Sequence, residues 1–449
     1  MKDKSFTRRS ALALFCAGAT SSVTTFSSGQ LLHAQAGATL APSKGKFLWG
    51  TATAGHQVEG NLVNDDCWLL ENLPNSTFKE PSGDACDHYH RFEEDIAMLA
   101  SFGLNAYRFS VEWSRIEPVK GAFSPAELGH YRRMLECCHK HGITPIVTYN
   151  HDATPAWFAL AGGWESPEAP ALFARYAARV TRDLGDLIGY AMTLNEPNLF
   201  TLFRWMQTPG GPLSDIILKD LPRTRAQLNQ PKFSSYFLGD PDRMRDGMLA
   251  AHGEARQAIK SERAGLPVGF SLAIEDDQAP LPSMNAVSHV EEKRRQVYGP
   301  WFEMAKKDDY IGLQNYSRSF VGKGNLPVPA GAEQTQNHSE FYPEGLEHVV
   351  RLVAKETGVP VLVTENGVST NDDTRRVEFI KRAVAGIERC RKDGVDVRAY
   401  IHWSLMDNFE WVFGFDIHFG LVAVDRATQK RTPKPSAYVL GNLAKNSRL

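Results

Sequence analysis

Two carboxylic acids follow strand-like segments of this chain and have similar polar neighbours. Glu196 lies in Thr193-Leu-Asn-Glu-Pro197, and Glu365 lies in Val363-Thr-Glu-Asn-Gly367. A single glutamate at the end of a strand more often forms an ion pair or caps a helix. Two glutamates at one mouth of a barrel can cleave a sugar acetal together, with one donating a proton and the other attacking the sugar. This chemistry needs the two carboxyl groups to lie about 5–5.5 Å apart. The matching pair therefore favours catalysis.

The segments that would position these acids alternate between two periods. Short apolar runs, rich in β-branched and aromatic residues, are followed by longer amphipathic stretches. The predicted strands are residues 47–52, 105–111, 144–149, 190–195, 268–273, 310–315, 361–365 and 397–403. Helical patterns between them include residues 89–102, 125–141, 167–187, 243–263, 343–356 and 374–392. This alternation predicts an α/β protein with a single (β/α)8 TIM barrel and inserted βα loops.

An open doubly wound sheet is the alternative architecture. It would normally carry a glycine-rich phosphate-binding turn after the first strand, and Gly50-Thr-Ala-Thr-Ala-Gly55 lacks that spacing. A closed barrel instead places the acids of its fourth and seventh strands at one mouth, where barrel enzymes build their sites. The barrel is therefore the preferred interpretation.

Two long inserts, residues 199–242 and 274–300, leave the predicted barrel from the carboxyl ends of its strands. Inserts at this end are expected to shape a site. The basic run Lys293-Arg294-Arg295 is expected to be a solvated helix face. The segment Asp87-His-Tyr-His90 begins a helical pattern and is expected to have a surface or capping role rather than to bind a metal.

Residues 1–36 are expected to be an export signal rather than part of the fold. Basic residues precede the apolar run 11–19, and Ala34-Gln-Ala36 is a small-x-small cleavage site. The pair Arg8-Arg9 indicates the twin-arginine route, which exports folded proteins. The protein is thus expected in the periplasm or secreted, with residues 37–449 forming the barrel. The alternative is a short tail that stays attached.

The charge balance argues against nucleic acid or an anionic membrane as a partner. Fifty Lys and Arg against 52 Asp and Glu give a net charge of -2, so a small neutral carbohydrate fits better. No later segment approaches the ~20 apolar residues of a membrane span, and no membrane anchor is expected. Five cysteines follow residue 36 without a paired zinc or redox motif. They predict at least one free thiol, no metal site and no cofactor.

Five motifs, in order along the chain, resemble those of glycoside hydrolase family 1. Two are Asn-Glu-Pro, ending at residue 197, and Thr-Glu-Asn-Gly, ending at residue 367. The others are Phe47-Leu-Trp-Gly-Thr-Ala-Thr-Ala-Gly-His-Gln-Val-Glu-Gly60, Tyr107-Arg-Phe-Ser-Val-Glu-Trp-Ser-Arg115 and Trp403-Ser-Leu-Met-Asp-Asn-Phe-Glu-Trp411, the last followed by Phe419-Gly-Leu-Val. One such motif is moderately specific, but five in order over residues 46–440 are strongly indicative.

This resemblance implies a role for each residue that matches a catalytic position. Glu365 would be the nucleophile and Glu196 the general acid and base, with a glycosyl-enzyme intermediate that water resolves. Arg108 and Tyr316 would hydrogen-bond the nucleophile, and the cation would keep it ionised. Asn195 would reach the sugar 2-hydroxyl, a contact that strengthens in the transition state.

The resemblance also implies which residues hold the nonreducing sugar. Gln57, His151, Glu410 and Trp411 would bind its hydroxyls, and Trp403 would be its stacking floor. Glu410 argues against phosphorylated sugars, because a carboxylate repels a 6-phosphate.

Three residues depart from the family pattern. Asp152 follows His151 where an aromatic is usual, and it places a polar group beside the sugar. Gln314 stands in place of an asparagine before Tyr316 and is expected to displace the surroundings of the nucleophile slightly. Ser339 lies near a position where a tryptophan often faces the leaving group. The resemblance therefore implies the family's full catalytic chemistry for this chain, but only the broad class of its substrate.

Together these features predict a retaining exo-β-glycosidase, most closely a β-glucosidase, that hydrolyses terminal non-phosphorylated β-D-glycosides. A transglycosidase on the same scaffold is a second interpretation. From a different class, a non-catalytic carbohydrate-binding barrel is disfavoured because both carboxylates are present. The glycone, the natural aglycone, the oligomeric state and the role of Asp152 are not specified at this level.

Overall fold

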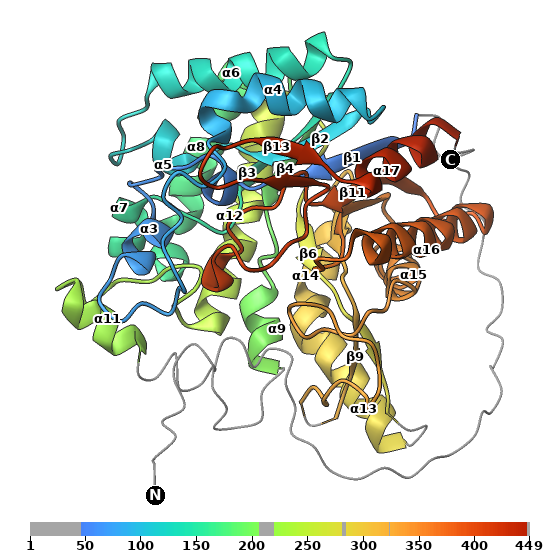
Figure 1. Ribbon diagram of the computed structural model, residues 1–449. Helices are drawn as coiled ribbons and strands as arrows, with labels where there is room; N and C mark the ends of the chain where they lie inside the picture. The colour runs from blue at the N-terminus through green and yellow to red at the C-terminus, as the bar shows by residue number, and fades with distance from the viewer. Residues whose placement is uncertain (1–45, 206–219, 281–283, 323, 447–449) are drawn as a thin grey trace, which may run out of the picture.

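Parallel strands form a ring at the centre of the structure, and helices cover its outside (Figure 1). This computed structural model describes residues 46–205, 220–280, 284–322 and 324–446. The strands of the ring are β1 (Leu48–Ala52), β2 (Ala106–Ser110), β3 (Thr144–Asn150), β4 (Tyr190–Leu194), β5 (Val268–Gly269), β6 (Ser271–Ala273), β8 (Ile311–Gln314), β10 (Val361–Asn366) and β11 (Val397–Trp403). They pair in parallel in the order β5-β4-β3-β2-β1-β11-β10-β8-β6.

The ring closes through residues 268–273. β5 pairs with β4 at one end of the sheet, and β6 pairs with β8 at the other. Phe270, between β5 and β6, accepts a hydrogen bond from the Gly312 amide at 2.8 Å. The predicted (β/α)8 barrel is therefore confirmed, with a fifth strand that is divided at Phe270 rather than continuous.

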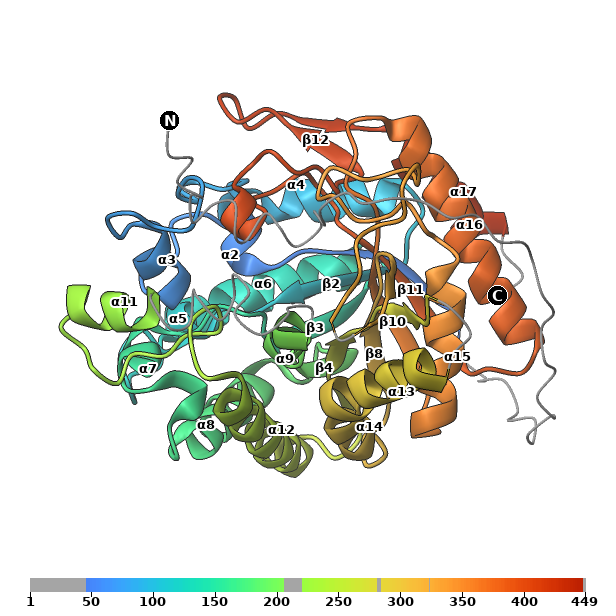
Figure 2. The ribbon, with the colours of Figure 1, turned by 90° about the horizontal axis from the view of Figure 1, so that it is seen from below.

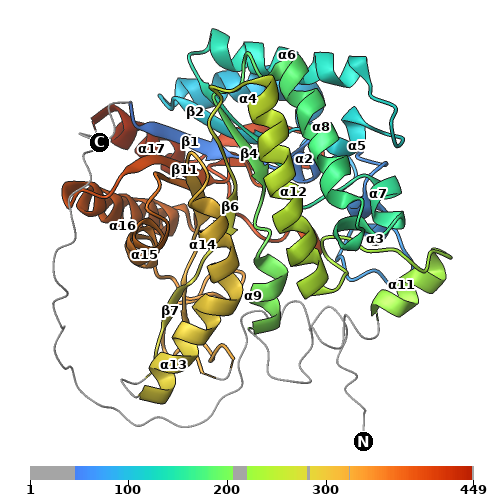
Figure 3. The ribbon, with the colours of Figure 1, turned by 180° about the vertical axis from the view of Figure 1, so that it is seen from behind.

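Helices follow most of the strands and pack around them (Figure 2). They are α4 (His88–Ser101), α6 (Pro125–Lys140), α8 (Ala169–Leu184), α12 (Pro241–Glu262), α14 (Gly299–Ala305), α15 (Gly345–Thr357), α16 (Asp373–Lys392) and α17 (Pro435–Asn446). Figure 3 shows α8 and α12 side by side on the outer surface. Among the described residues, no helix combines the length and the apolar character that crossing a bilayer requires.

The two faces of the strands bury different sets of side chains, because successive residues of a strand point to opposite sides. On β11, Ala399, Ile401 and Trp403 pack inside the barrel. Tyr400 packs outward, against the helices. This alternation places Trp403, the last residue of β11, at the carboxyl end of the barrel interior.

Shorter elements surround the carboxyl ends of the strands. They are α2 (Gly55–Val58), α3 (Asp66–Glu71), α5 (Trp113–Ile116), α7 (Ala156–Leu160), η2 (Gly163–Glu165), α9 (Leu199–Trp205), α11 (Leu221–Gln227), β7 (Asp276–Gln278), α13 (Met284–Lys293), η4 (Arg294–Tyr298), β9 (Arg318–Phe320), η5 (Trp411–Phe413), β12 (Val422–Val424) and β13 (Arg431–Pro433). In both Figures 1 and 3, α9 and α13 lie on the same side of the barrel. Both predicted inserts therefore extend from the same end of the barrel, where the strands have their carboxyl ends.

The prediction of a solvated helix face at residues 293–295 is wrong for its first member. Lys293 is fully buried, whereas the Arg295 side chain is 70% exposed. The reason is that Lys293 points onto Glu275 and Asp277, two acids from the start of the same insert. A basic run in a helical pattern does not show which of its members will meet such partners.

A buried ion pair ties the C-terminal hairpin to α4. Asp95 accepts hydrogen bonds from Arg431 Nε at 2.9 Å and Nη2 at 3.0 Å, and lies 2.8 Å from His88 Nδ1. His88 is buried, so the surface or capping role expected for residues 87–90 is wrong for this histidine. The neighbouring His90 is exposed and contacts Asp87.

We expect Asp95→Ala to destabilise the fold by about 3–5 kcal/mol, because the substitution leaves Arg431 buried without its partner. Thermal unfolding would show a clearly lower midpoint. The control is Arg182→Ala, which breaks an exposed pair with Glu262 and should leave the midpoint nearly unchanged. An unchanged midpoint for Asp95→Ala would contradict this account of the C-terminal hairpin.

Candidate active site

The ends of β4 and β10 bring Glu196 and Glu365 to one cavity of about 300 Å³. The same cavity is lined by the predicted sugar-binding residues Gln57, His151, Asn195, Tyr316, Trp403, Glu410 and Trp411. Arg108, on β2, is fully buried behind this lining and contacts Glu365. The structure thus brings together every residue that the sequence singled out as catalytic or sugar-binding.

Three side chains donate hydrogen bonds to the Glu365 carboxylate. Arg108 Nη1 donates to Oε1 at 2.5 Å, and Gln314 Nε2 donates to the same oxygen at 2.9 Å. The Tyr316 hydroxyl donates to Oε2. Gln314 is therefore a direct partner of the carboxylate rather than only a residue that shifts its neighbours. Charge-assisted bonds of this kind fix the orientation of the acid toward the cavity.

Arg108 connects Glu365 to two other strands. Its Nε donates to Thr148 Oγ1 on β3 at 3.1 Å, and its Nη2 donates to Asn195 Oδ1, after β4, at 2.6 Å. A buried guanidinium needs acceptors for its N–H groups, and its planar shape sets where those acceptors lie. Arg108 thereby fixes Glu365 relative to Asn195, the neighbour of Glu196.

Among the described residues, no cation forms an ion pair with Glu196, and the contact that holds it is to its backbone. Its φ of 40° lies in the left-handed region, which is strained for a residue other than glycine. The Tyr236 hydroxyl donates to the Glu196 carbonyl oxygen at 2.8 Å. A strained backbone conformation persists only where the surrounding structure holds it in place, and such residues are typical of functional sites.

The surroundings of the two acids separate their pKa values. Burial raises the pKa of Glu365, but Arg108 and the Tyr316 hydroxyl oppose this rise. Burial, and then the negative charges of Glu365 and Asp152, raise the pKa of Glu196 well above its usual value. Glu196 therefore keeps its proton at a pH where Glu365 has lost its own. A proton donor and a nucleophile need this difference.

Asp152 forms the cavity wall next to Asn195. It is 3% exposed, and its Oδ1 accepts a hydrogen bond from Asn195 Nδ2 at 3.1 Å. Burial raises the pKa of Asp152 to about 8, although the bond from Asn195 opposes the rise. Asn195 is thus oriented from both ends, by Asp152 and by Arg108. One of its amide hydrogens is left to donate to a sugar hydroxyl.

Gln57 and Glu410 form a second polar wall of the cavity. Gln57 Nε2 donates to the Phe409 carbonyl oxygen at 2.7 Å and to Glu410 Oε2 at 3.4 Å. Burial, and then the charge of Glu365, raise the pKa of Glu410 to about 8. Gln57 Oε1 is buried without a hydrogen-bond partner in the described part of the chain. Because buried polar atoms are normally paired, this oxygen fits a hydroxyl donor from a ligand.

His151 and Trp403 both line the cavity, and their rings stack. Their ring centroids are 5.7 Å apart, with 29° between the planes. Burial, and then the charge of Arg108, lower the pKa of His151 well below its usual value, so the ring is neutral. Its Nδ1 is buried without a partner among the described residues. A neutral imidazole offers one donor and one acceptor, which suits sugar hydroxyls.

Sequence reasoning missed the group that supports Trp411. The His56 ring stacks on the Trp411 indole at 5.6 Å, with 5° between the planes. His56 Nδ1 lies 2.6 Å from Asp65 Oδ2, and Nε2 lies 3.3 Å from Glu71 Oε2. Burial lowers the pKa of His56, but these acids raise it well above its usual value. Trp411 therefore rests on an imidazolium, a favourable cation–π arrangement. His56 lies in the first of the five motifs and Trp411 in the last, but only the fold shows that the two side chains stack.

His56, Asp65 and Cys67 also place three donor atoms within 4.8 Å of one another, as ligands of a metal ion would be. Both imidazole nitrogens already contact carboxylates, and burial raises the pKa of the Cys67 thiol well above its usual value. A metal needs the thiolate and a free ring nitrogen. The hydrogen bonding therefore favours a buried ion pair over a metal site.

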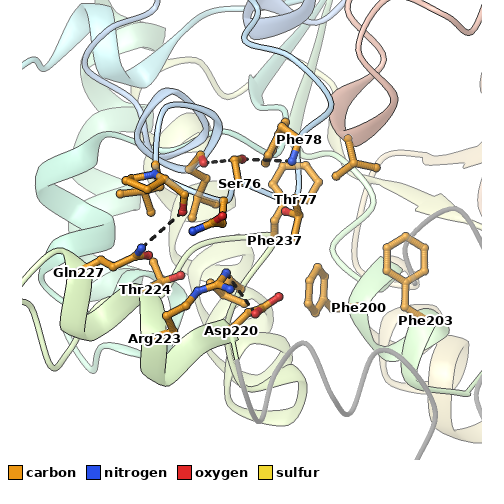
Figure 4. A pocket seen from close by; sticks show the side chains of 16 residues that line it. Ser76, Thr77, Phe78, Phe200, Phe203, Asp220, Arg223, Thr224, Gln227 and Phe237 are labelled. Atoms are coloured by element: carbon orange, nitrogen blue, oxygen red, sulfur yellow. Dashed lines mark hydrogen bonds and ion pairs between the residues drawn. The ribbon is translucent and has the colours of Figure 1, made fainter. Parts of the chain in front are cut away.

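A second pocket, of about 40 Å³, adjoins the cavity and shares Phe203, Phe237 and Val412 with it. Figure 4 shows Arg223 and Asp220 at its edge, near the ring of Phe200. The pocket contains none of the predicted catalytic or sugar-binding residues and is small for a sugar ring. The larger cavity is therefore the candidate active site.

A parallel barrel in which a clamped carboxylate faces a protonated one across the strand ends has the architecture of a glycoside hydrolase. The family comparison agrees with this class. The chain belongs to glycosyl hydrolase family 1, whose sequence model matches residues 41–328 and 306–449. The resemblance carried by the five motifs is thereby confirmed.

Similar proteins cover almost the whole of the barrel. Beta-glucosidase A of Thermotoga maritima is 30% identical over 446 residues, which cover 90% of this chain and 98% of the relative. An apo structure of a beta-glucosidase, 1317, has a TM-score of 0.84 at 47% identity and covers 89% of this chain and 98% of its own. A crystal structure of the beta-glycosidase BGL167 has a TM-score of 0.83 at 47% identity, with coverages of 89% and 96%.

We expect Tyr316→Phe to shift the acidic limb of the pH profile of kcat/KM upward by about one unit. Loss of the hydroxyl donor destabilises the ionised form of Glu365 and so raises its pKa, and the nucleophile is then protonated at higher pH. The profile is measured on an aryl β-glucoside. Tyr149→Phe, which removes a buried hydroxyl bonded to Thr181 outside the cavity, is the control and should keep the original limb. An unchanged limb in Tyr316→Phe would refute the assigned contact.

Proposed function

We propose that this protein is a retaining exo-β-glycosidase that acts chiefly on β-glucosides, with Glu365 as nucleophile and Glu196 as general acid and base. The observation that carries this proposal is the asymmetry between the two acids in one cavity. Glu365 is clamped by Arg108, Gln314 and Tyr316, whereas the pKa of Glu196 is raised well above its usual value. The names of the similar proteins support glucosides as substrates.

In the first step, Glu196 donates its proton to the glycosidic oxygen. The bond from the anomeric carbon to that oxygen breaks, and Glu365 forms a bond to the same carbon from the opposite face. Arg108 and Tyr316 keep the attacking carboxylate ionised and oriented. The leaving group departs as a neutral alcohol, and the sugar stays attached to the enzyme as an ester of Glu365.

In the second step, Glu196 acts as a base. The esterified Glu365 no longer carries a negative charge, and that charge is the second cause of the raised pKa of Glu196. The pKa of Glu196 therefore falls once the intermediate forms, and the ionised group can take a proton from water. Water attacks the anomeric carbon, Glu365 leaves, and two inversions give a product of retained configuration.

We expect Glu365→Ala to lower kcat more than about 10⁴-fold, because no nucleophile remains. Added azide enters the vacated space and attacks the anomeric carbon directly. With an activated aryl β-glucoside, partial rescue should give the α-glycosyl azide, which has inverted configuration. The products are identified by NMR.

Glu196→Ala is the matched variant that separates the two roles. It leaves Glu365 in place, so azide attacks the glycosyl-enzyme and should give the β-glycosyl azide. The opposite pairing of products would exchange the two roles, and full activity in Glu365→Ala would end the proposal.

We also propose that the protein is exported through the twin-arginine route. The support is the sequence pattern of Arg8-Arg9 before an apolar run and a small-x-small site. In a Gram-negative host, the full chain should appear in the periplasmic fraction, and the double variant Arg8→Lys, Arg9→Lys should stay in the cytosol. Glycosidase activity in each fraction is the readout, and equal distribution of both chains would contradict the route.

A further inference from the structure

A buried charged cluster lies at the edge of the cavity and takes no part in the two-step chemistry. Lys293 Nζ lies 2.6 Å from Glu275 Oε2, 2.6 Å from Asp277 Oδ1 and 3.2 Å from Asn325 Oδ1. Asn325 Nδ2 donates to Glu275 Oε2 at 3.1 Å. The Lys293 and Asp277 side chains have no exposure, whereas that of Glu275 is 20% exposed. We refer to Lys293, Glu275, Asp277 and Asn325 as the lysine cluster.

Burying such a cluster is expensive, because charges lose their hydration. Burial lowers the pKa of Lys293, but the charges of Asp277 and Glu275 raise it above its usual value, so the ammonium is retained. Such a cluster is not needed to stabilise the fold, since apolar residues of similar volume at these positions would often give equal stability. Its geometry does fix one carboxylate. In the described part of the chain, every polar side-chain contact of Glu275 uses Oε2, and Oε1 is left over.

Glu275 belongs to the lining of the catalytic cavity. It follows β6, whereas Gln57 follows β1. β5 and β6 are the two halves of one divided strand, so they count as one position in the ring. From that position, β1 is four places away in either direction, through β4, β3 and β2 or through β8, β10 and β11. Glu275 and Gln57 thus line opposite sides of the mouth. Since Gln57 and Glu410 form the proposed wall for the glycone, we place the leaving group on the opposite side of the mouth, with Glu275.

The wall around Glu275 has a polar and an apolar part. Ser317 and Asn337 line the cavity with it, and Leu202 and Phe203 line it from α9, which follows β4, the strand next to β5. A sugar presents apolar C–H faces and polar hydroxyl edges, so it can use both parts together. An aryl group would use only the apolar part.

We propose that Glu275, positioned by Lys293, hydrogen-bonds a hydroxyl of the leaving group and makes the enzyme selective for glycosides whose leaving group is itself a sugar. This inference rests on the proposed function and specifies the substrate class of the same cavity. Oε1 accepts the hydroxyl, and the bonds to Oε2 hold the carboxylate against rotation.

The test compares two substrates that share a glycone. One is a β-linked disaccharide of glucose, and the other is para-nitrophenyl β-glucoside, whose leaving group has no hydroxyl to donate. Glu275→Ala should lower kcat/KM for the disaccharide by at least about 10-fold, the typical effect of removing a hydrogen bond to a substrate hydroxyl. It should change the aryl value less than about 3-fold, because that leaving group makes no such bond. Glu275→Gln, which keeps an acceptor at this position, should recover part of the loss.

The control is Glu291→Ala, an exposed acid on the helix that carries Lys293, and it should change neither substrate. Retained aryl activity reports that each variant is folded. Equal losses on both substrates, no loss on the disaccharide, or an unaltered protein that cleaves only the aryl glucoside would each overturn the proposal. Absence of activity on both substrates in the unaltered protein would instead overturn the proposed function.

Discussion

The buried ion pair between Arg108 and Glu365 is the interaction on which the rest of the site depends. Arg108 is fully buried on β2, and through Thr148, Asn195 and Glu365 it joins side chains of β3, of β10 and of the turn after β4. Without this cation, burial alone would raise the pKa of Glu365 and leave it protonated. The guanidinium therefore sets the ionisation of one acid and, through Asn195, the place of the other.

The acids around the sugar-binding part of the cavity also explain why it suits a neutral polyol. Asp152 and Glu410 each have a pKa raised to about 8, chiefly by burial, and Glu196 has a pKa well above its usual value. Near neutral pH these groups hold protons, so each can both donate and accept a hydrogen bond. Hydroxyl groups have the same double capacity. An anionic sugar would meet the charge of Glu365 and the acceptor oxygens of its neighbours.

The inserts contribute the part of the cavity that the barrel does not define. The strands and the segments that follow them carry the catalytic acids and the sugar contacts, whereas Glu275 and its lysine lie on the segment between β6 and α14. In the same way, His56 supports Trp411 through acids on and just before α3. In both cases a charge buried outside the cavity orients a side chain inside it. Selectivity and chemistry thus rest on different parts of one chain.

The sequence by itself determined the barrel, because eight alternations of apolar runs and amphipathic stretches allow few other folds, and it located both acids at strand ends. It did not show that the fifth strand divides at Phe270, that Gln314 donates to Glu365, or that Lys293 is buried. Those features depend on contacts between residues far apart in the chain, such as Lys293 with Asn325, which no local period encodes. Local patterns report which face of an element is apolar. Which charge meets which acid was decided only when the elements packed together.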